Sequence, residues 1–275
     1  MLVQDMMQHT VISAPPDTSL AEALDLMQEH RIRHLPVVSG QQMIGMLTDR
    51  DCRQAMPSSS STLSLEEIIA KLDTVAIETC MTAPVVTVPP QSDSVETARQ
   101  LLDGKFDCLP VVQQHELVGI VTATDFLRAF LSTSASVNPD VSVSDYMQTD
   151  PLTVAPTDIV RTAYHRMRCA HIRHLPVVAT GRRLVGLLTD RDVRHLQASA
   201  IPALTTYELR EPTYTLTVQE VMTLHVATVG EHTPMAEAGE RLLSHRFGCL
   251  PVVSAHDTLE GIVTVRDLIR GYIHT

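Results

Sequence analysis

Threonine and aspartate recur at one spacing, in the pattern Gly-x-x-Thr-x-x-Asp, four times along the chain. The spacing is that of a capping box, in which a hydroxyl and a carboxylate satisfy backbone N–H groups at a helix start. The same groups could bind a ligand, because a helix N-terminus attracts anions, a hydroxyl can donate to phosphate and a carboxylate can accept both hydroxyls of a ribose. Both roles can coexist. The four pairs are Thr48 and Asp51, Thr122 and Asp125, Thr189 and Asp192, and Thr264 and Asp267.

A strand-like Leu-Pro-Val-Val precedes each pattern, and the glycine stands nine or ten residues after its proline. Two pairs of copies are more alike than the rest. Residues 31–38 match 171–178 at seven of eight positions, and 106–112 match 247–253 at six of seven. Copy one therefore corresponds to copy three, and copy two to copy four, which indicates that a two-copy module was duplicated whole.

Each copy reads as strand, helix, strand, strand, helix. A short first strand is expected at 12–14, 86–88, 152–154 and 227–229, followed by a helix with apolar residues three and four apart, as at Leu20, Ala23, Leu24 and Met27. The proline of Leu-Pro-Val-Val suits a strand start, where a missing N–H costs least. A further helix is predicted at 65–72 in the connector between copies one and two.

Composition narrows the class of protein. With 275 residues, two domains are a better expectation than one. A net charge of -11, no tryptophan and few aromatics argue against nucleic-acid binding. No apolar run is long enough to cross a bilayer and no signal peptide is visible, so we expect a soluble, cytoplasmic protein without a membrane partner. Five cysteines without a C-x-x-C pair argue for reduced thiols, and no residue pattern suggests a protein-ligated metal.

The repeated Leu-Pro-Val-Val and Gly-x-x-Thr-x-x-Asp together resemble the CBS domain, named for cystathionine beta-synthase. The resemblance implies an α/β fold of four βαββα CBS units, packed in pairs as two Bateman modules with mixed sheets and flanking helices. The predicted boundaries are residues 1–131 for module one (units 1–56 and 77–131), 132–142 for a linker, and 143–275 for module two (units 143–197 and 218–273).

The resemblance also implies up to two ligand clefts per module, for AMP, ADP or ATP and less often for S-adenosylmethionine, NAD or a dinucleotide. The family's ribose-binding aspartate corresponds to Asp51, Asp125, Asp192 and Asp267, and its phosphate-side hydroxyl to Thr48, Thr122, Thr189 and Thr264. Apolar groups of the first strand would hold the adenine, at Ile12, Val86, Leu152 and Ala227. Magnesium could enter with ATP.

The copies differ where phosphate charge should be met. Basic residues that reach phosphate in the family correspond to Arg33 and His34 in copy one, and to Arg173 and His174 in copy three. Copies two and four have Asp107-Cys108 and Gly248-Cys249 there. Arginine presents a fork of donors to phosphate whereas aspartate repels it, so unequal sites are expected. The two histidines could make affinity pH-dependent. Four more arginines are candidate helpers: Arg50, Arg53, Arg191 and Arg194.

The predicted function is a non-catalytic regulatory sensor, because the repeats leave no room for a catalytic domain. Its output would pass to an unknown partner protein or through a change of assembly, either a four-copy disc within the chain or a homodimer. The alternative is a protein-interaction scaffold with empty or structural clefts, which would tolerate replacement of Asp51 or Asp192. A sensor of S-adenosylmethionine or NAD also stays open.

Overall fold

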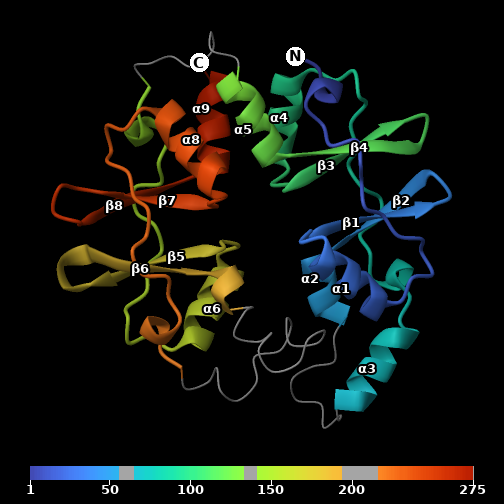
Figure 1. Ribbon diagram of the computed structural model, residues 1–275, viewed down its shortest axis with the longest axis horizontal. Coiled ribbons are helices and arrows are strands. Elements are labelled where there is room, and N and C mark those ends of the chain that lie inside the picture. The colour runs from blue at the N-terminus through green and yellow to red at the C-terminus, as the bar shows by residue number, and fades with distance from the viewer. Residues whose placement is uncertain (56–64, 133–140, 194–215, 275) are drawn as a thin grey trace. The chain divides into compact units, whose positions relative to one another are not determined.

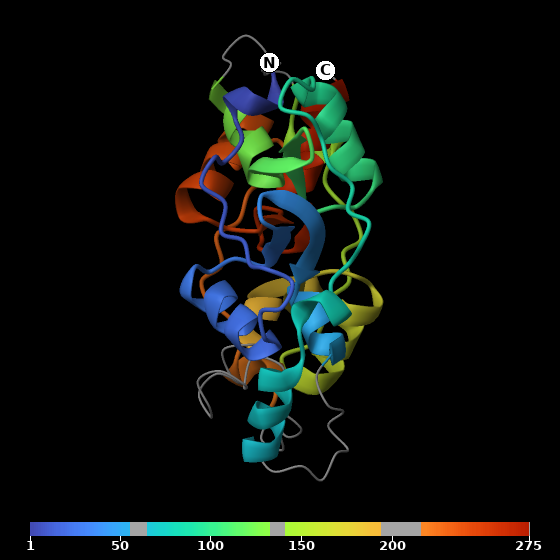
Figure 2. The same cartoon turned by 90° about the vertical axis from the view of Figure 1, so that its right-hand side faces the viewer.

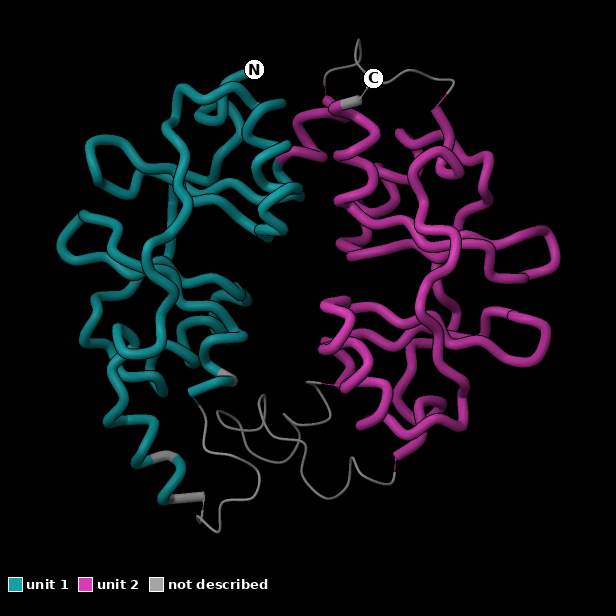
Figure 3. Tube along the Cα trace, turned by 180° about the vertical axis from the view of Figure 1, so that it is seen from behind, with its two compact units in different colours: residues 1–125 teal, residues 126–275 magenta. Residues whose placement is uncertain are grey.

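The computed structural model describes residues 1–55, 65–132, 141–193 and 216–274. It divides into two compact units, residues 1–125 and 126–275, which Figure 3 shows in different colours. The division falls within a helix, so the last part of that helix packs with the second unit. The linker predicted at 132–142 lies almost entirely outside the described residues.

The first unit contains two copies of one arrangement (Figure 1): a 3-10 turn, a helix, a two-stranded hairpin and a second helix. Copy one consists of η1 (Val3–Asp5), α1 (Leu20–Glu29), β1 (His34–Ser39), β2 (Gln42–Thr48) and α2 (Asp49–Ala55). Copy two consists of η2 (Ile77–Thr79), α4 (Ser94–Asp103), β3 (Cys108–Gln113), β4 (Glu116–Thr122) and α5 (Ala123–Ser132).

Between these copies lies α3 (Leu65–Thr74), which confirms the helix predicted in the connector. It packs against α1, and Figures 1 and 2 show it continuing past α1 and α2, at the end of the unit away from β3 and β4. Among the α3 side chains that the structure describes, Ile68 and Leu72 are buried, four apart on one face. The connector thus adds a helix to the repeat, and copies one and two keep the same order of helices and strands on either side of it.

The second unit repeats the arrangement. Copy three consists of η3 (Val143–Asp145), α6 (Val160–Cys169), β5 (His174–Ala179), η4 (Thr180–Arg182), β6 (Arg183–Thr189) and a helix that begins at residue 190. Copy four consists of η6 (Val218–Glu220), α8 (Met235–His245), β7 (Cys249–Val253), β8 (Leu259–Thr264) and α9 (Val265–His274). The end of α5 joins this unit, where the ring of Phe130 stacks on that of Tyr272.

The sheets are mixed, as the predicted fold class requires. In the first unit the strand order is β1-β2-β4-β3, with antiparallel hairpins joined by the pairing of Gln42 with Glu116. In the second, β5 pairs with β6 and β7 with β8, and an isolated antiparallel bridge joins Arg183 to Thr258. The expected first strand is reduced in every copy to one parallel bridge: Ala14 to Val37, Val88 to Val111, Val154 to Val177, and Val229 to Val252.

The proline of Leu-Pro-Val-Val does not open its strand, which corrects the sequence-based expectation. Pro36 is the third residue of β1 and pairs with Met46. Its carbonyl accepts from the N–H of Ala14 at 3.0 Å, and Ala14 in turn accepts from the N–H of Val38 at 2.9 Å. The missing N–H of Pro36 thus faces the side of the strand where the chain pairs at a single residue, so no ladder bond is lost.

The buried strands and the amphipathic helices form the core of each copy. Leu35 and Val37 of β1 have no exposed surface, and neither do Leu175 and Val177 at the same positions of β5. The helix N-termini that face them are capped where the sequence allows it: Ser19 Oγ accepts from the N–H of Glu22 at 3.1 Å at the start of α1. In every copy the second strand of the hairpin ends at the threonine of the Thr-x-x-Asp pair.

Candidate functional site

The Thr-x-x-Asp pair forms the same polar contacts in all four copies. One carboxylate oxygen, Oδ2, accepts both from the backbone N–H and from the hydroxyl of the threonine. In copy one these distances are 2.8 and 2.7 Å, from Thr48 to Asp51. They are 3.0 and 2.7 Å in copy two, 2.7 and 2.7 Å in copy three, and 2.9 and 2.7 Å in copy four. The capping-box interpretation is confirmed in copies one and three, where the threonine hydroxyl also accepts from the N–H of the aspartate at 3.3 and 3.2 Å.

The bonds restrict what the threonine can do for a ligand. A hydroxyl has one proton, and here it is donated to the aspartate in every copy. Donation to a phosphate would require the hydroxyl to rotate away from the carboxylate. Its remaining capacity as an acceptor is partly used as well, because Thr48 Oγ1 accepts from the N–H of Asp51 at 3.3 Å. The threonine therefore acts first as the group that orients the carboxylate.

The second carboxylate oxygen, Oδ1, distinguishes the copies. In copies one and three no described residue donates a hydrogen bond to Oδ1 of Asp51 or Asp192. In copy two, Gln8 Nε2 donates to Asp125 Oδ1 at 2.9 Å, and in copy four Arg270 donates to Asp267 Oδ1 at 3.2 Å. An ionised carboxylate only accepts hydrogen bonds, so Asp51 and Asp192 retain an oxygen for two hydroxyl donors.

Segments that cross between copies bring further residues to these carboxylates. The methionine that follows each 3-10 turn packs on the glycine of the other copy in the same unit, at a position where a Cβ would overlap the methionine side chain. The pairs are Met81 on Gly45, Met7 on Gly119, Met222 on Gly186 and Met147 on Gly261. This close approach explains the glycine of Gly-x-x-Thr-x-x-Asp.

The residue after each methionine was missed by the sequence analysis. Gln8, Thr82, Gln148 and Thr223 each exchange two backbone hydrogen bonds with the strand of the other copy, one residue after its glycine. Each of these strand partners stands two residues before the threonine of a Thr-x-x-Asp pair, in copies two, one, four and three in turn. The signal was present in the fourfold Met-Gln or Met-Thr dipeptide. The sequence does not show that the segment carrying this dipeptide pairs with a strand of the neighbouring copy.

The basic residues of copies one and three lie next to the site of their own copy. The N–H of Asp49 donates to the carbonyl of Arg33 at 3.2 Å, and that of Asp190 to the carbonyl of Arg173 at 2.9 Å. The residue before each strand is thus joined to the first residue of the helix that carries the aspartate. Arg50 and Arg191 are exposed on those helices, whereas the side chains of Arg53 and Arg194 lie outside the described residues.

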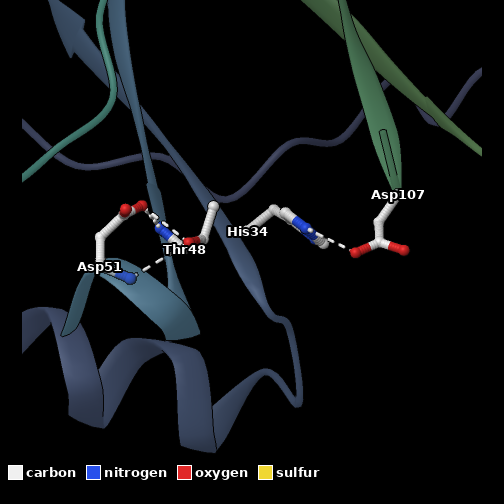
Figure 4. A network of polar contacts seen from close by, with 4 residues as sticks. All are labelled: His34, Thr48, Asp51 and Asp107. Atoms are coloured by element: carbon white, nitrogen blue, oxygen red, sulfur yellow. Dashed lines mark hydrogen bonds and ion pairs between the residues drawn. The ribbon is translucent and has the colours of Figure 1, made fainter. Parts of the chain in front are cut away.

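The histidines face different groups in the two units. His34 Nε2 lies 3.8 Å from Asp107 Oδ2, an ion pair only when the imidazole is protonated, and Figure 4 shows the two side chains pointing toward one another beside Thr48 and Asp51. In the second unit the ring of His174 packs where a Cβ of Gly248 would stand. The acidic residue expected to weaken phosphate binding in copy two therefore lies beside the basic group of copy one.

The residues expected around adenine are accessible apolar groups. Val86 and Leu152 are 41% and 40% exposed, and Ile12 and Ala227 are half-buried. Each stands two residues before the single parallel bridge of its copy. An exposed valine or leucine at this place offers apolar surface that a planar base could cover.

Three cysteines are buried and chemically protected. Burial raises the pKa of Cys108 and of Cys249 to about 12. It raises the pKa of Cys52 further, with smaller contributions from the neighbouring Cys80 and Asp49. These thiols stay protonated at neutral pH, so they behave as small apolar core groups.

Within the described ranges no three His, Cys, Asp or Glu side chains gather closely enough to hold a metal ion. Among the same residues, no helix has the length and apolar character needed to cross a membrane.

A comparison with known protein families matches the CBS domain four times, at residues 3–58, 76–132, 143–199 and 218–274. The chain belongs to the CBS-domain family. This confirms the fourfold repeat recognised in the sequence, and the pairing of copies within each unit is that of a Bateman module.

Two solved structures share the fold along the whole chain. The protein MJ1225 of Methanocaldococcus jannaschii, proposed to be an archaeal homolog of g-AMPK, has a crystal structure that matches with a TM-score of 0.79 at 22% identity, covering 99% of this chain and 100% of that one. In a sequence comparison MJ1225 is 27% identical over 272 residues, 95% of each protein. A conserved protein from Pyrococcus horikoshii matches with a TM-score of 0.71 at 18% identity and covers 99% and 100% of the two chains.

A shorter likeness links the chain to an enzyme. Inosine-5'-monophosphate dehydrogenase of Korarchaeum cryptofilum is 40% identical over 110 residues, which are 40% of this chain and 21% of the enzyme. The chain therefore spans about a fifth of the length of that relative.

Proposed function

We propose that this chain is a non-catalytic regulatory sensor that binds an adenine nucleotide, AMP, ADP or ATP, at Asp51 in copy one and at Asp192 in copy three. The observation that carries the proposal is the state of these carboxylates. Threonine holds Oδ2 in place, while no described residue bonds Oδ1. A pre-oriented oxygen with two lone pairs suits the vicinal hydroxyls of a ribose.

The surroundings support an anionic ligand in the same two copies. The backbone of Arg33 is tied to the start of α2, and that of Arg173 to the helix that begins at residue 190. Each arginine is thereby kept close to the aspartate that would bind the ribose, and a guanidinium offers phosphate two parallel hydrogen bonds. The first-strand residues of these two copies, the half-buried Ile12 and the exposed Leu152, provide apolar surface for the base.

The short segments between the CBS domains support a regulatory role. The matched CBS domains leave only 59–75, 133–142 and 200–217 between them, too little for a catalytic domain inside this stretch of chain. A ligand that binds one geometry of a module more tightly than another shifts the module toward that geometry. We propose that a partner protein or an altered assembly reads this shift.

The test is a thermal melt of ligand-free protein with AMP, ADP, ATP, S-adenosylmethionine or NADH. A ligand at 100 times its dissociation constant should stabilise the chain by about 2.7 kcal/mol. The effective ligand is then titrated by calorimetry into Asp51→Ala and Asp192→Ala. Each loses charge-assisted hydrogen bonds worth about 3 kcal/mol together, so one site should weaken about 100-fold in each variant.

Asp25→Ala is the matched control, because Asp25 is an exposed carboxylate on α1, and it should bind like the unaltered chain. Absence of any shift with all five ligands would refute the sensor and favour a protein-interaction scaffold. A shift with S-adenosylmethionine or NADH alone would keep the sensor and correct the ligand.

A further inference from the structure

Gln8 is held in one position by the strand of the other copy. Its N–H donates to the carbonyl of Ile120 at 2.8 Å, and its carbonyl accepts from the N–H of Ile120 at 3.0 Å. The preceding Met7 packs on Gly119. Two backbone bonds and a packed neighbour fix where the Gln8 side chain leaves the chain.

From this position the side chain reaches Asp125. Gln8 Nε2 donates to Asp125 Oδ1 at 2.9 Å, while Oδ2 already accepts from Thr122 at 3.0 and 2.7 Å. Because a carboxylate accepts only, the amide nitrogen must be the atom that faces it. Both oxygens of Asp125 are therefore bonded, and the residue is only 5% exposed.

Copy one presents the same backbone with a shorter side chain. Thr82 exchanges hydrogen bonds of 2.9 and 3.0 Å with Met46, as Gln8 does with Ile120, and Met81 packs on Gly45. No hydrogen bond joins Thr82 to Asp51 in the described structure, and Asp51 Oδ1 is left open. At the crossing position the two sites of the first unit thus differ, with glutamine facing copy two and threonine facing copy one.

We infer that Gln8 is a specificity-determining residue that closes the copy-two cleft to a ribose diol by bonding Asp125 Oδ1, whereas Thr82 leaves the copy-one cleft open. The inference rests on the proposed function, since it takes the aspartates as the ribose-binding groups. A ribose entering copy two must displace a hydrogen bond to a charged group. That bond corresponds to about tenfold to 100-fold in affinity.

The second unit uses a different group at the corresponding place. Gln148 pairs with Ile262 as Gln8 pairs with Ile120, but the donor to Asp267 Oδ1 is Arg270 at 3.2 Å. Arg270 is 51% exposed, so it can swing into solvent at little cost. The role of Gln8 is therefore tested by substitutions in the first unit, and the second unit keeps its sequence in every variant.

The experiment counts bound adenosine per full-length chain by equilibrium dialysis. Adenosine carries the diol without phosphate, so the charge of Asp107 does not enter. The reciprocal exchange Gln8→Thr and Thr82→Gln is the matched pair, since each places the side chain of one cleft in the other. Gln8→Thr should bind one more adenosine than the unaltered chain, and Thr82→Gln should bind one fewer, its copy-one affinity weakened about tenfold to 100-fold.

Gln8→Thr combined with Asp125→Ala localises the effect, because the added site should disappear. Should Gln8→Thr fail to fold, as judged by its melting curve, Thr82→Gln alone decides between the outcomes. Equal counts in all variants, with binding by the unaltered chain, would overturn the role of Gln8 and leave the proposed function intact. No binding by the unaltered chain but one adenosine in Gln8→Thr would overturn the proposed sites and keep the inference. No binding in any variant would overturn both.

Discussion

The two units carry the same Thr-Asp geometry but differ in the group that faces their histidine. In the first unit His34 faces Asp107, and in the second His174 packs against Gly248. A second pair of positions differs as well: Cys52 and Cys80 of the first unit correspond to Val193 and Val221 of the second, which lie in one apolar cluster. The duplicated module has thus kept its carboxylate orientation while changing the charge and chemistry beside it.

The geometry of the Thr-Asp pair and the charge beside it are therefore independent. The Thr-Asp contacts depend on a three-residue spacing at a helix start, which any copy with that spacing will form. The charge beside His34 depends on a residue contributed by the other copy. Two copies with the same Thr-x-x-Asp sequence can therefore differ in their affinity for a charged ligand.

The largest expected effect concerns the core, where the units should be equivalent. Leu35→Ala and Leu175→Ala each remove a fully buried side chain at the same place in β1 and β5. Each should lower the free energy of unfolding by about 2–5 kcal/mol, as measured by urea denaturation. Leu224→Ala, at an exposed leucine, is the control and should change it by less than about 0.5 kcal/mol. Clearly unequal losses would show that the two hairpins are packed differently.

The next effect concerns the free energy of unfolding at alkaline pH, which should fall more in the first unit than in the second as the pH rises. Burial raises the pKa of Cys52 above its usual value of 9.0, so between pH 9 and the folded value the unfolded chain releases a proton that the folded chain keeps. Stability falls with rising pH in that window. Cys52→Val, which copies Val193, should remove about 1.4 kcal/mol of the loss between pH 8 and pH 10, measured by urea denaturation at both values.

Val193→Cys is the reciprocal variant and should add a comparable alkaline loss to the second unit. If Cys52→Val and the unaltered chain lose the same stability between the two pH values, burial of this thiol is not the cause.

A smaller effect is expected for the charge beside His34. Asp107→Gly copies Gly248 and removes the negative charge beside His34, one of the residues proposed to meet the phosphate. The affinity for ATP at that copy should rise about fivefold, corresponding to about 1 kcal/mol, while that for adenosine should stay unchanged. Calorimetry at two salt concentrations checks this, since the gain should shrink with salt. Asp103→Asn, at an exposed residue of α4, should have no such effect, and an equal gain there would refute a local cause.

The smallest effect belongs to Arg270, whose exposed guanidinium donates to Asp267. Arg270→Ala should change the free energy of unfolding by less than about 1 kcal/mol, because surface ion pairs gain little over solvated charges. A loss several times larger in urea denaturation would show that Arg270 holds α9 in place rather than only covering a carboxylate.

Much of the fold could be predicted from the sequence because it repeats. The four copies, their pairing, the helix at 65–72 and the capping role of Thr48 with Asp51 were all predicted, and they depend on local spacing. The first strand was overestimated, since one bridging residue such as Ala14 suffices when the strand beside it is already paired on its other side. The prediction that Pro36 begins its strand was wrong for the same reason.

The ligand-binding roles of the twelve predicted site residues stay predictions, and the structure sharpens them unequally. It links Arg33 and Arg173 to the helices of their own copies, and it brings His34 to an acidic residue of another copy. No reading of one copy could have found Gln8 as the partner of Asp125, because 117 positions separate them in the chain.

The repeated unit, its elements and the orientation of each carboxylate follow from the sequence, since they depend on residues within a few positions of one another. Whether Oδ1 of each aspartate accepts a further hydrogen bond depends on contacts beyond the Thr-x-x-Asp pair. In the first unit this depends on segments that cross between copies, such as Met7-Gln8 onto β4 and Met81-Thr82 onto β2. Backbone pairing between distant segments brings a side chain to a site that its own sequence neighbours do not reveal.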